Sequence, residues 1–237
     1  MILNELKIFV INLPSAIDRR EHITTELNKL KLPFEVFNAV NGNTDLSYAN
    51  KHYSPLGRLL RYARPLSNSQ IGCFASHYEL WNKCITLNEP ILVLEDDIDF
   101  SLNFVTQLKL LLPCLDDYHY IRLAGTFQRP KCYVRNNVSL YSKKGPGGTI
   151  AYLLDPEAAQ RLLNRASKWI EPVDEYMDRY WLHGVLPYVA EPEIVFFESK
   201  FESSVVNKYP AKIIFKITRE VYKLYRGFCK LLFDCKK

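Results

Sequence analysis

Several features that would assign the chain to a special class are missing from its sequence. It has no run of eighteen apolar residues, so no segment is predicted to span a membrane. Its six cysteines are scattered, without a Cys-x-x-Cys pair or a zinc-like Cys/His spacing, which favours reduced thiols over a disulfide framework. Asn4, Glu5 and Lys7 interrupt any apolar core near the N-terminus, so we expect no export signal. Together these absences predict a cytoplasmic protein.

The composition is that of an ordinary globular protein, with 48% apolar and 24% charged residues in 237. This length is enough for one large α/β domain, or for one domain with an appendage. Strands are predicted at residues 7–13, 34–40, 91–94, 118–124 and 149–154, with a hairpin at 131–134 and 139–141. Helices are predicted to begin at Ser15, Ser69 and Asp155, and another covers residues 101–112. This alternation predicts an open, mostly parallel α/β sheet that binds ligands at the carboxyl ends of its strands.

The strand predicted at residues 91–94 ends abruptly in acid. Four carboxylates follow within five positions: Glu95, Asp96, Asp97 and Asp99. Unpaired buried charge is unfavourable, so such a cluster belongs where a buried strand emerges, and it usually needs a cation. Mg²⁺ and Mn²⁺ favour carboxylate oxygens and often share them with substrate phosphates. The segment therefore predicts a site for a metal-chelated diphosphate, and a solvated acidic loop is the alternative.

The C-terminal segment accounts for the net positive charge of the chain, +5. From Ala211 onward there are eight basic residues and two acidic ones, a net charge of +6, which leaves the rest of the chain at −1. One helical stripe is apolar, formed by Ile214, Ile217, Val221, Leu224, Phe228 and Leu231. The opposite face is basic, formed by Lys216, Arg219, Lys223, Arg226 and Lys230. A basic amphipathic helix that starts after Pro210 is suited to an anionic membrane surface.

Other interpretations of this helix stay open. It would also suit a helix docked on the body with solvated lysines, or a two-stranded coiled coil. Tyr222, Tyr225 and Phe233 supply the aromatic side chains that favour the membrane interface. Nucleic acid is not expected as a partner, because the rest of the chain has no basic excess to extend the footprint. The oligomeric state is undetermined, since the helix could pair with itself.

Six motifs occur in order along the chain. They are Val10-Ile11-Asn12-Leu13 with Arg19-Arg20, Phe37-Asn38-Ala39-Val40-Asn41-Gly42, Gly72-Cys73-Phe74-Ala75-Ser76-His77, Leu94-Glu95-Asp96-Asp97, Gly148-Thr149-Ile150-Ala151-Tyr152-Leu153-Leu154, and Pro172-Val173-Asp174. This series resembles glycosyltransferase family 25, the lipooligosaccharide and collagen galactosyltransferase group. The resemblance covers about residues 7–205. Residues 43–68 depart from the pattern, which leaves the acceptor open.

The resemblance implies a GT-A-like catalytic domain at residues 1–209, ahead of the membrane-associating helix at 210–237. It also implies a UDP-sugar donor, most often UDP-galactose, a Mn²⁺ or Mg²⁺ ion, and inversion at the anomeric carbon. Glu95 and Asp97 would hold the ion, with Asp99 as a substitute, because a cation bridging both phosphates neutralises the leaving group. Inversion needs a base that takes the proton of the acceptor hydroxyl. The motif match gives this role to Asp174, with Glu175 as its rival and a helix N-cap as the alternative role.

The residues expected to contact the donor are Asn12, Arg19, Arg20, Ser76, His77, Asp96 and Gly148. Asn12 would bind the uracil or ribose, and one of the two arginines a phosphate, unless both are solvated on a first helical turn. Asp96 would point to a ribose hydroxyl or a lysine. Gly148 would let the backbone approach the donor sugar, unless it only makes a turn. Ser76 and His77 rest on the motif alone, since a lone histidine on a helix is more often structural.

The sequence thus predicts a cytoplasmic, peripheral membrane galactosyltransferase that builds bacterial surface oligosaccharide (lipooligosaccharide or LPS) on a lipid-linked acceptor. Its partners would be a nucleotide sugar, an oligosaccharide acceptor and an anionic membrane. The polar segment at residues 44–67 predicts a long loop or short helices, and its tyrosines and arginines would suit a sugar or anionic acceptor. His183 is a weaker candidate for the metal. Two alternatives remain: an enzyme of the same fold with another nucleotide sugar, and a non-catalytic module that binds sugar or membrane.

Overall fold

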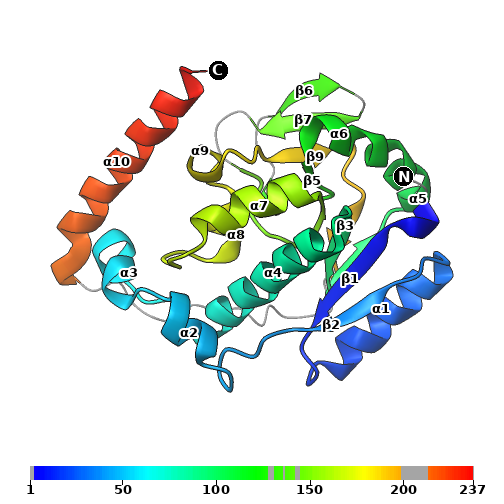
Figure 1. Ribbon diagram of the computed structural model, residues 1–237, viewed down its shortest axis with the longest axis horizontal. Coiled ribbons are helices and arrows are strands. Elements are labelled where there is room, and N and C mark those ends of the chain that lie inside the picture. The colour runs from blue at the N-terminus through cyan, green and yellow to red at the C-terminus, as the bar shows by residue number, and fades with distance from the viewer. Residues whose placement is uncertain (1–2, 128–130, 136, 142–144, 199–212, 237) are drawn as a thin grey trace.

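A computed structural model describes residues 3–127, 131–135, 137–141, 145–198 and 213–236 (Figure 1). Eight strands of this part of the chain form one mixed sheet in the order β2-β1-β3-β8-β5-β9-β7-β6. Their bounds are β1 Lys7–Asn12, β2 Glu35–Asn38, β3 Ile91–Glu95, β5 Tyr120–Arg122, β6 Lys131–Arg135, β7 Val138–Tyr141, β8 Ala151–Leu154 and β9 Tyr188–Ala190. A second sheet pairs β4 (Ile98–Phe100) with β10 (Val195–Phe197).

The predicted α/β class is confirmed, and most strands of the large sheet run in one direction. β8 runs antiparallel to both of its neighbours, β3 and β5, and β7 is antiparallel to β9 and β6. The hairpin predicted at residues 131–134 and 139–141 is confirmed by β6 and β7, whereas the reversal of β8 was not predicted. A buried apolar run predicts that a strand exists but leaves its direction open, because both pairings can bury the same side chains.

Helices cover both faces of the sheet and build two cores. The α-helices are α1 Ile17–Lys29, α2 Ser47–His52, α3 Pro55–Tyr62, α4 Asn68–Leu87, α5 Phe104–Leu111, α6 Leu115–Tyr118, α7 Pro156–Arg165, α8 Val173–Met177, α9 Tyr180–His183 and α10 Lys216–Asp234. Short 3-10 helices cover Leu3–Glu5, Leu112–Cys114 and Ile213–Phe215. Ile8 and Val10 of β1 join the core under α1 and α5, whereas Phe9 and Ile11 join the core under α4, α7 and α8. This alternation is what a strand buried on both faces produces.

The helix starts were predicted with mixed success. Asp155 caps α7 as expected, since its carboxylate accepts a hydrogen bond from the Ala158 amide at 2.8 Å. The cap of α4 is Ser67 and not Ser69, because Ser67 forms a reciprocal capping box with Gln70. Ser15 does not cap α1 either, because the N-cap position is Ala16 and lacks a side-chain hydrogen bond.

The polar segment after β2 forms short helices, α2 and α3, which settles the choice left open by the sequence. Its arginines are not all available to a ligand. Arg58 is 1% exposed and donates to the carbonyl oxygens of Arg64 and Ile170, both at 3.0 Å. Its guanidinium therefore braces the fold and does not present itself to an acceptor.

The long C-terminal helix α10 lies beside α3 and α9 at the edge of the molecule (Figure 1). Its predicted start after Pro210 falls outside the described residues, and the 3-10 turn at Ile213–Phe215 leads into it. None of the described helices combines the length and the apolar character needed to cross a bilayer.

Candidate active site

One cavity of about 600 Å³ opens at the edge of the sheet where β1 and β3 end. β1, β2 and β3 are mutually parallel through β1, so their carboxyl ends meet there. The polar residues that line the cavity include Arg19, Asn41, Gln70, Ser76, His77, Glu95, Asp96, Asp97, Thr149, Asp174, Glu175 and Glu198. Seven of the sequence-predicted site residues therefore come together with Asp174 in one place: Arg19, Ser76, His77, Glu95, Asp96, Asp97 and Gly148.

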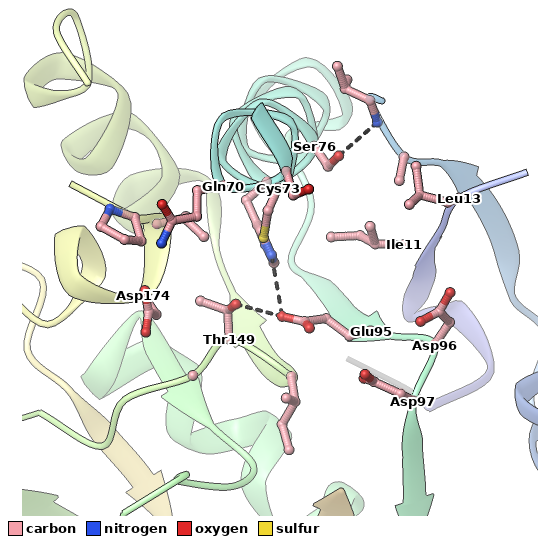
Figure 2. Close-up of a pocket in the computed structure, with 18 of the residues that line it drawn as sticks. Ile11, Leu13, Gln70, Cys73, Ser76, Glu95, Asp96, Asp97, Thr149 and Asp174 are labelled. Atoms are coloured by element: carbon pink, nitrogen blue, oxygen red, sulfur yellow. Dashed lines mark hydrogen bonds and ion pairs between the residues drawn. The ribbon is translucent and has the colours of Figure 1, made fainter. Parts of the chain in front are cut away.

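Glu95 is the last residue of β3 and turns toward β8 and α4 (Figure 2). Its Oε1 accepts a hydrogen bond from Thr149 Oγ1 at 2.6 Å and lies 3.6 Å from His77 Nε2. Burial acts to raise the pKa of Glu95, but the hydrogen bond and charge of His77, together with Thr149, outweigh it and lower the pKa. Glu95 is thus held as a carboxylate.

Asp96 points to the other side, toward α1 (Figure 2). It accepts hydrogen bonds from Asn12 Nδ2 at 2.7 Å and from Arg19 Nη1 at 3.2 Å. Asn12 is 1% exposed and does not line the cavity, so the structure gives it the role of holding Asp96. Asp96 meets a guanidinium and an amide, and not the lysine that the sequence suggested.

Asp97 offers the clearest place for a cation. Its Oδ2 accepts from Arg19 at 2.9 Å, but its Oδ1 is buried and has no hydrogen-bond partner. Burial, and then the charge of Glu95, raise the pKa of Asp97 to about 6. The negative charge at this carboxylate is therefore only partly compensated. A hard divalent cation, which prefers carboxylate oxygens, fits this donor set.

Asp99 lies elsewhere. Its Oδ1 is 3.1 Å from His22 Nε2, and the carboxylate of Glu198 is also near. Among the described residues, these three side chains form the one group of three with ligand atoms all within 4.8 Å of one another. Asp99 does not line the cavity, so the structure does not bring it together with Glu95 and Asp97.

Asp174 lies across the cavity from Asp97 (Figure 2). Asp174 and its neighbour Glu175 belong to the first turn of α8, and both line the cavity. The N-cap of this helix is Pro172, so the alternative role of Asp174 as a helix cap is wrong. Burial, and then the charge of Glu171, raise the pKa of Glu175. A carboxylate of raised pKa is a better proton acceptor near neutral pH, which strengthens Glu175 as the rival of Asp174.

Ser76 and His77 act mainly as braces in this structure. Both are fully buried; Ser76 Oγ donates to the Gly72 carbonyl and accepts from the Val40 amide, both at 2.9 Å. His77 Nδ1 lies 2.9 Å from the hydroxyl of Tyr152, and its other nitrogen faces Glu95. The two residues fix a cavity wall and orient one acid, in agreement with the structural role that the sequence also allowed.

Gly72 permits a close approach that shapes this wall. A Cβ atom at Gly72 would lie 2.4 Å from the Val40 carbonyl oxygen and 2.7 Å from the Gly42 amide nitrogen. The glycine therefore lets α4 pack directly on the backbone that follows β2. Residues 39–43 line the cavity as a result.

The turn at Gly147 and Gly148 forms another part of the cavity wall. Both residues have positive φ, +67° and +65°, and a Cβ at Gly148 would lie 2.2 Å from Thr126 Oγ1. Arg122, 1% exposed, donates to the carbonyl oxygens of both glycines and pairs with Asp178 at 3.0 Å. Arg122 was missed by the sequence reasoning, since a lone arginine in a predicted strand gives no signal of its partners.

Two further predicted residues lie away from the cavity. Arg20 is exposed on α1 and does not line it. His183 is buried, with one ring nitrogen accepting from the Val185 amide at 3.1 Å and the other 3.2 Å from the Tyr176 carbonyl oxygen. Both nitrogens are engaged, so His183 is not placed to hold a metal in this cavity.

The profile of the family described as "Glycosyltransferase family 25 (LPS biosynthesis protein)" matches residues 5–177. The chain belongs to glycosyltransferase family 25. Every cavity acid except Glu198 falls within the matched part.

Several known proteins are similar to this family 25 chain. Procollagen galactosyltransferase 2 of Homo sapiens is 32% identical over 197 residues, which cover 77% of this chain and 31% of the relative. Lipooligosaccharide biosynthesis protein lic2B of Haemophilus influenzae is 38% identical over 91 residues, covering 38% of this chain and 33% of the relative. A probable inactive glycosyltransferase 25 family member 3 of Bos taurus is 28% identical over 184 residues, covering 72% and 31%. The chain spans about a third of the length of these relatives.

Proposed function

We propose that this family 25 chain is an inverting β-galactosyltransferase that moves galactose from UDP-galactose to a lipid-linked oligosaccharide acceptor of the lipooligosaccharide or LPS type. The observation that carries the proposal is one cavity with acids on two opposite walls, Asp97 at the end of β3 and Asp174 with Glu175 on α8. The names of the galactosyltransferase and lipooligosaccharide relatives support the donor and the acceptor. The parallel β1, β2 and β3 with acids at their carboxyl edge suit a GT-A-like nucleotide-sugar site.

The cation is proposed to be Mn²⁺ or Mg²⁺, held by Asp97 with Glu95 as the second carboxylate. When bound, it supplies positive charge that stabilises the diphosphate leaving group. Arg19 pairs with Asp96 and Asp97, and it would turn to a phosphate oxygen if the cation takes over these carboxylates. Thr149 and His77 keep Glu95 charged and oriented, and the hydrogen bond from Asn12 orients Asp96.

Across the cavity, Asp174 is proposed to take the proton of the attacking acceptor hydroxyl. Glu175 is the alternative, favoured by its raised pKa. An inverting reaction needs this base on the face of the sugar away from the leaving group. A donor bound between the two acidic walls would have its diphosphate near Asp97 and its other face near Asp174 and Glu175. Gly148 lines the cavity, and its backbone is proposed to lie beside the donor sugar.

The proposed place of action is the cytoplasmic face of the bacterial membrane. The apolar stripe of α10 and of the 3-10 turn before it points to solvent, with its six side chains between 58% and 79% exposed: Ile214, Ile217, Val221, Leu224, Phe228 and Leu231. A stripe of this size is suited to the boundary between headgroups and acyl chains, where a lipid-linked acceptor is found. The helix would thus concentrate the enzyme near its acceptor.

Two alternatives to galactosyl transfer from UDP-galactose remain. Another nucleotide sugar would use the same cavity, because one inverted hydroxyl is read by a few hydrogen bonds. A non-catalytic module is favoured by the relative described as probably inactive.

The test is a panel of nucleotide sugars with a short lactosyl acceptor, read by mass spectrometry, with and without Mn²⁺. The proposal predicts galactosyl transfer that depends on the metal. Transfer from a different donor would support the first alternative. Absence of donor hydrolysis and transfer with every nucleotide sugar would support the module.

A further inference from the structure

A partly buried network of charged and aromatic side chains joins the C-terminal helix to the acidic wall of the cavity. The sequence predicted the apolar stripe of α10 but not the flank by which the helix docks. Contacts to the body come from Tyr222, Arg226, Lys230, Phe233 and Asp234. The docked flank is therefore basic and aromatic, while the apolar stripe lies on the far side.

The hydroxyl of Tyr62, at the end of α3, lies at the centre of this network. It accepts a hydrogen bond from Arg226 Nη1 at 3.0 Å and donates to Glu171 Oε2. The ring of Tyr62 is held on one side by Arg58, 4.0 Å from its centroid, and on another by Tyr222 at 5.8 Å. Tyr62 is thus fixed by α10 and itself contacts Glu171.

Glu171 is a buried carboxylate, 1% exposed, whose two oxygens have different partners. One accepts from Tyr62 and the other from Arg179 Nη1 at 2.6 Å. A buried carboxylate requires such donors, so loss of one is strongly unfavourable. Glu171 immediately precedes Pro172, the N-cap of α8, and the first turn of α8 carries Asp174 and Glu175 into the cavity.

We propose that α10 positions the acidic wall of the cavity: Arg226 holds Tyr62 on Glu171, and Glu171 fixes the first turn of α8. Arg226 and Tyr62 are positioning residues, since neither lines the cavity. The consequence for turnover rests on the proposed function, whereas the consequence for the order of α8 does not. The helix that presents the apolar stripe is thereby linked to the candidate base through Tyr62 and Glu171.

Amide hydrogen exchange of the full chain, read by mass spectrometry, tests this link. Four variants are compared with the wild type: Arg226→Gln, Arg226→Lys, Tyr62→Phe and Lys223→Gln. Lys223→Gln is the matched control, because it removes the same charge from the same helix and Lys223 pairs with Glu220 on α10 itself. Peptides covering residues 171–179 should exchange about tenfold faster in Arg226→Gln and Tyr62→Phe. Lys223→Gln should match the wild type, and Arg226→Lys should recover part of the protection.

The same variants are then assayed for transfer. Arg226→Gln and Tyr62→Phe should lower kcat several-fold while KM for the donor stays within about twofold, because the donor site itself is intact. Unchanged exchange at residues 171–179 in both variants, or equal loosening in Lys223→Gln, would overturn the link. Faster exchange in β1 and β3 of Arg226→Gln would mean that this variant is destabilised as a whole. The exchange of residues 171–179 in Tyr62→Phe then decides whether the link exists, since this variant removes only one oxygen. A wild type that transfers nothing refutes the proposed function and leaves the exchange result valid.

Discussion

Arg19 Nη1 lies 2.9 Å from Asp97 Oδ2, and the same nitrogen reaches Asp96 at 3.2 Å. One guanidinium therefore pairs with two acids that the sequence had assigned to different ligands. The pair is partly buried, with the two side chains of Arg19 and Asp97 15% and 14% exposed. Yet the second oxygen of Asp97 has no partner, so the arginine alone does not satisfy the site.

Asp97→Asn is expected to make the protein more stable at neutral pH while weakening metal binding. The folded-state pKa of Asp97, about 6, is above its ordinary value of 3.8. The folded state favours protonated Asp97, so the protein is not penalised by this residue below about pH 4 and loses stability as the pH rises through about 6 and the carboxyl ionises. At pH 7.5 the asparagine variant should gain about 1–3 kcal/mol in free energy of unfolding.

Urea unfolding at pH 4.5 and 7.5 measures this, with Mn²⁺ added in a second series. The gain of the variant should be larger at pH 7.5, and Mn²⁺ should stabilise the wild type more than the variant. Identical pH dependence in the two proteins would contradict the account of Asp97.

Asp174→Asn should lower kcat by at least about 100-fold if Asp174 is the base, since general-base catalysis contributes 10²–10⁴. Glu175→Gln is its matched partner on the same helical turn. The steady-state rate of transfer at saturating donor decides between them. One of the two variants should lose most of its turnover while the other keeps a substantial part. Retention of near wild-type rates by both would remove the base from this wall.

Gly72→Ala should destabilise the protein by about 1–3 kcal/mol, because the new methyl group meets the backbone at Val40 and Gly42. Gly227→Ala is the control, since a Cβ there has nothing within 4 Å and lies in the interior of α10. The control should be neutral or stabilising, by up to about 1 kcal/mol. Thermal unfolding compares them. A Gly72→Ala protein as stable as the wild type would show that α4 can move away from residues 40–42.

Replacing Leu224 and Phe228 by serine should weaken binding to anionic vesicles at least about tenfold, because each side chain offers apolar area worth about 1.5–3 kcal/mol when buried. Co-sedimentation with phosphatidylserine vesicles gives the affinity. The helix should stay docked, since neither residue contacts the body through the network around Tyr62. Unchanged vesicle binding, together with a concentration-dependent dimer of the wild type, would favour the coiled coil instead.

Much of the site could be predicted because its elements have local signals. A buried apolar run followed directly by Glu95, Asp96 and Asp97 is informative in itself, since charge must leave the core at a strand end. The turn at Gly148 and the helix cap at Asp155 were likewise predicted from their immediate sequence neighbours. The structure places these acids at the shared edge of parallel strands, as the alternation of strands and helices implied.

What could not be predicted depends on contacts between distant segments. Asp99 is held apart from Glu95 and Asp97 by contacts among three segments, because it lies in β4, His22 belongs to α1 and Glu198 follows β10. The docking flank of α10 was hidden for a related reason. A helical wheel shows the two faces of α10, but it does not reveal that Arg226 packs over the rings of Tyr62 and Trp181.

A crystal of the chain soaked in Mn²⁺ and UDP, with the manganese located by its anomalous signal, tests the central claim most directly. We expect the ion beside the Asp97 carboxylate, bridging to the diphosphate, with Arg19 moved from Asp97 to a phosphate oxygen. A nucleotide bound in the cavity with no manganese near Glu95, Asp96 or Asp97 would contradict the account.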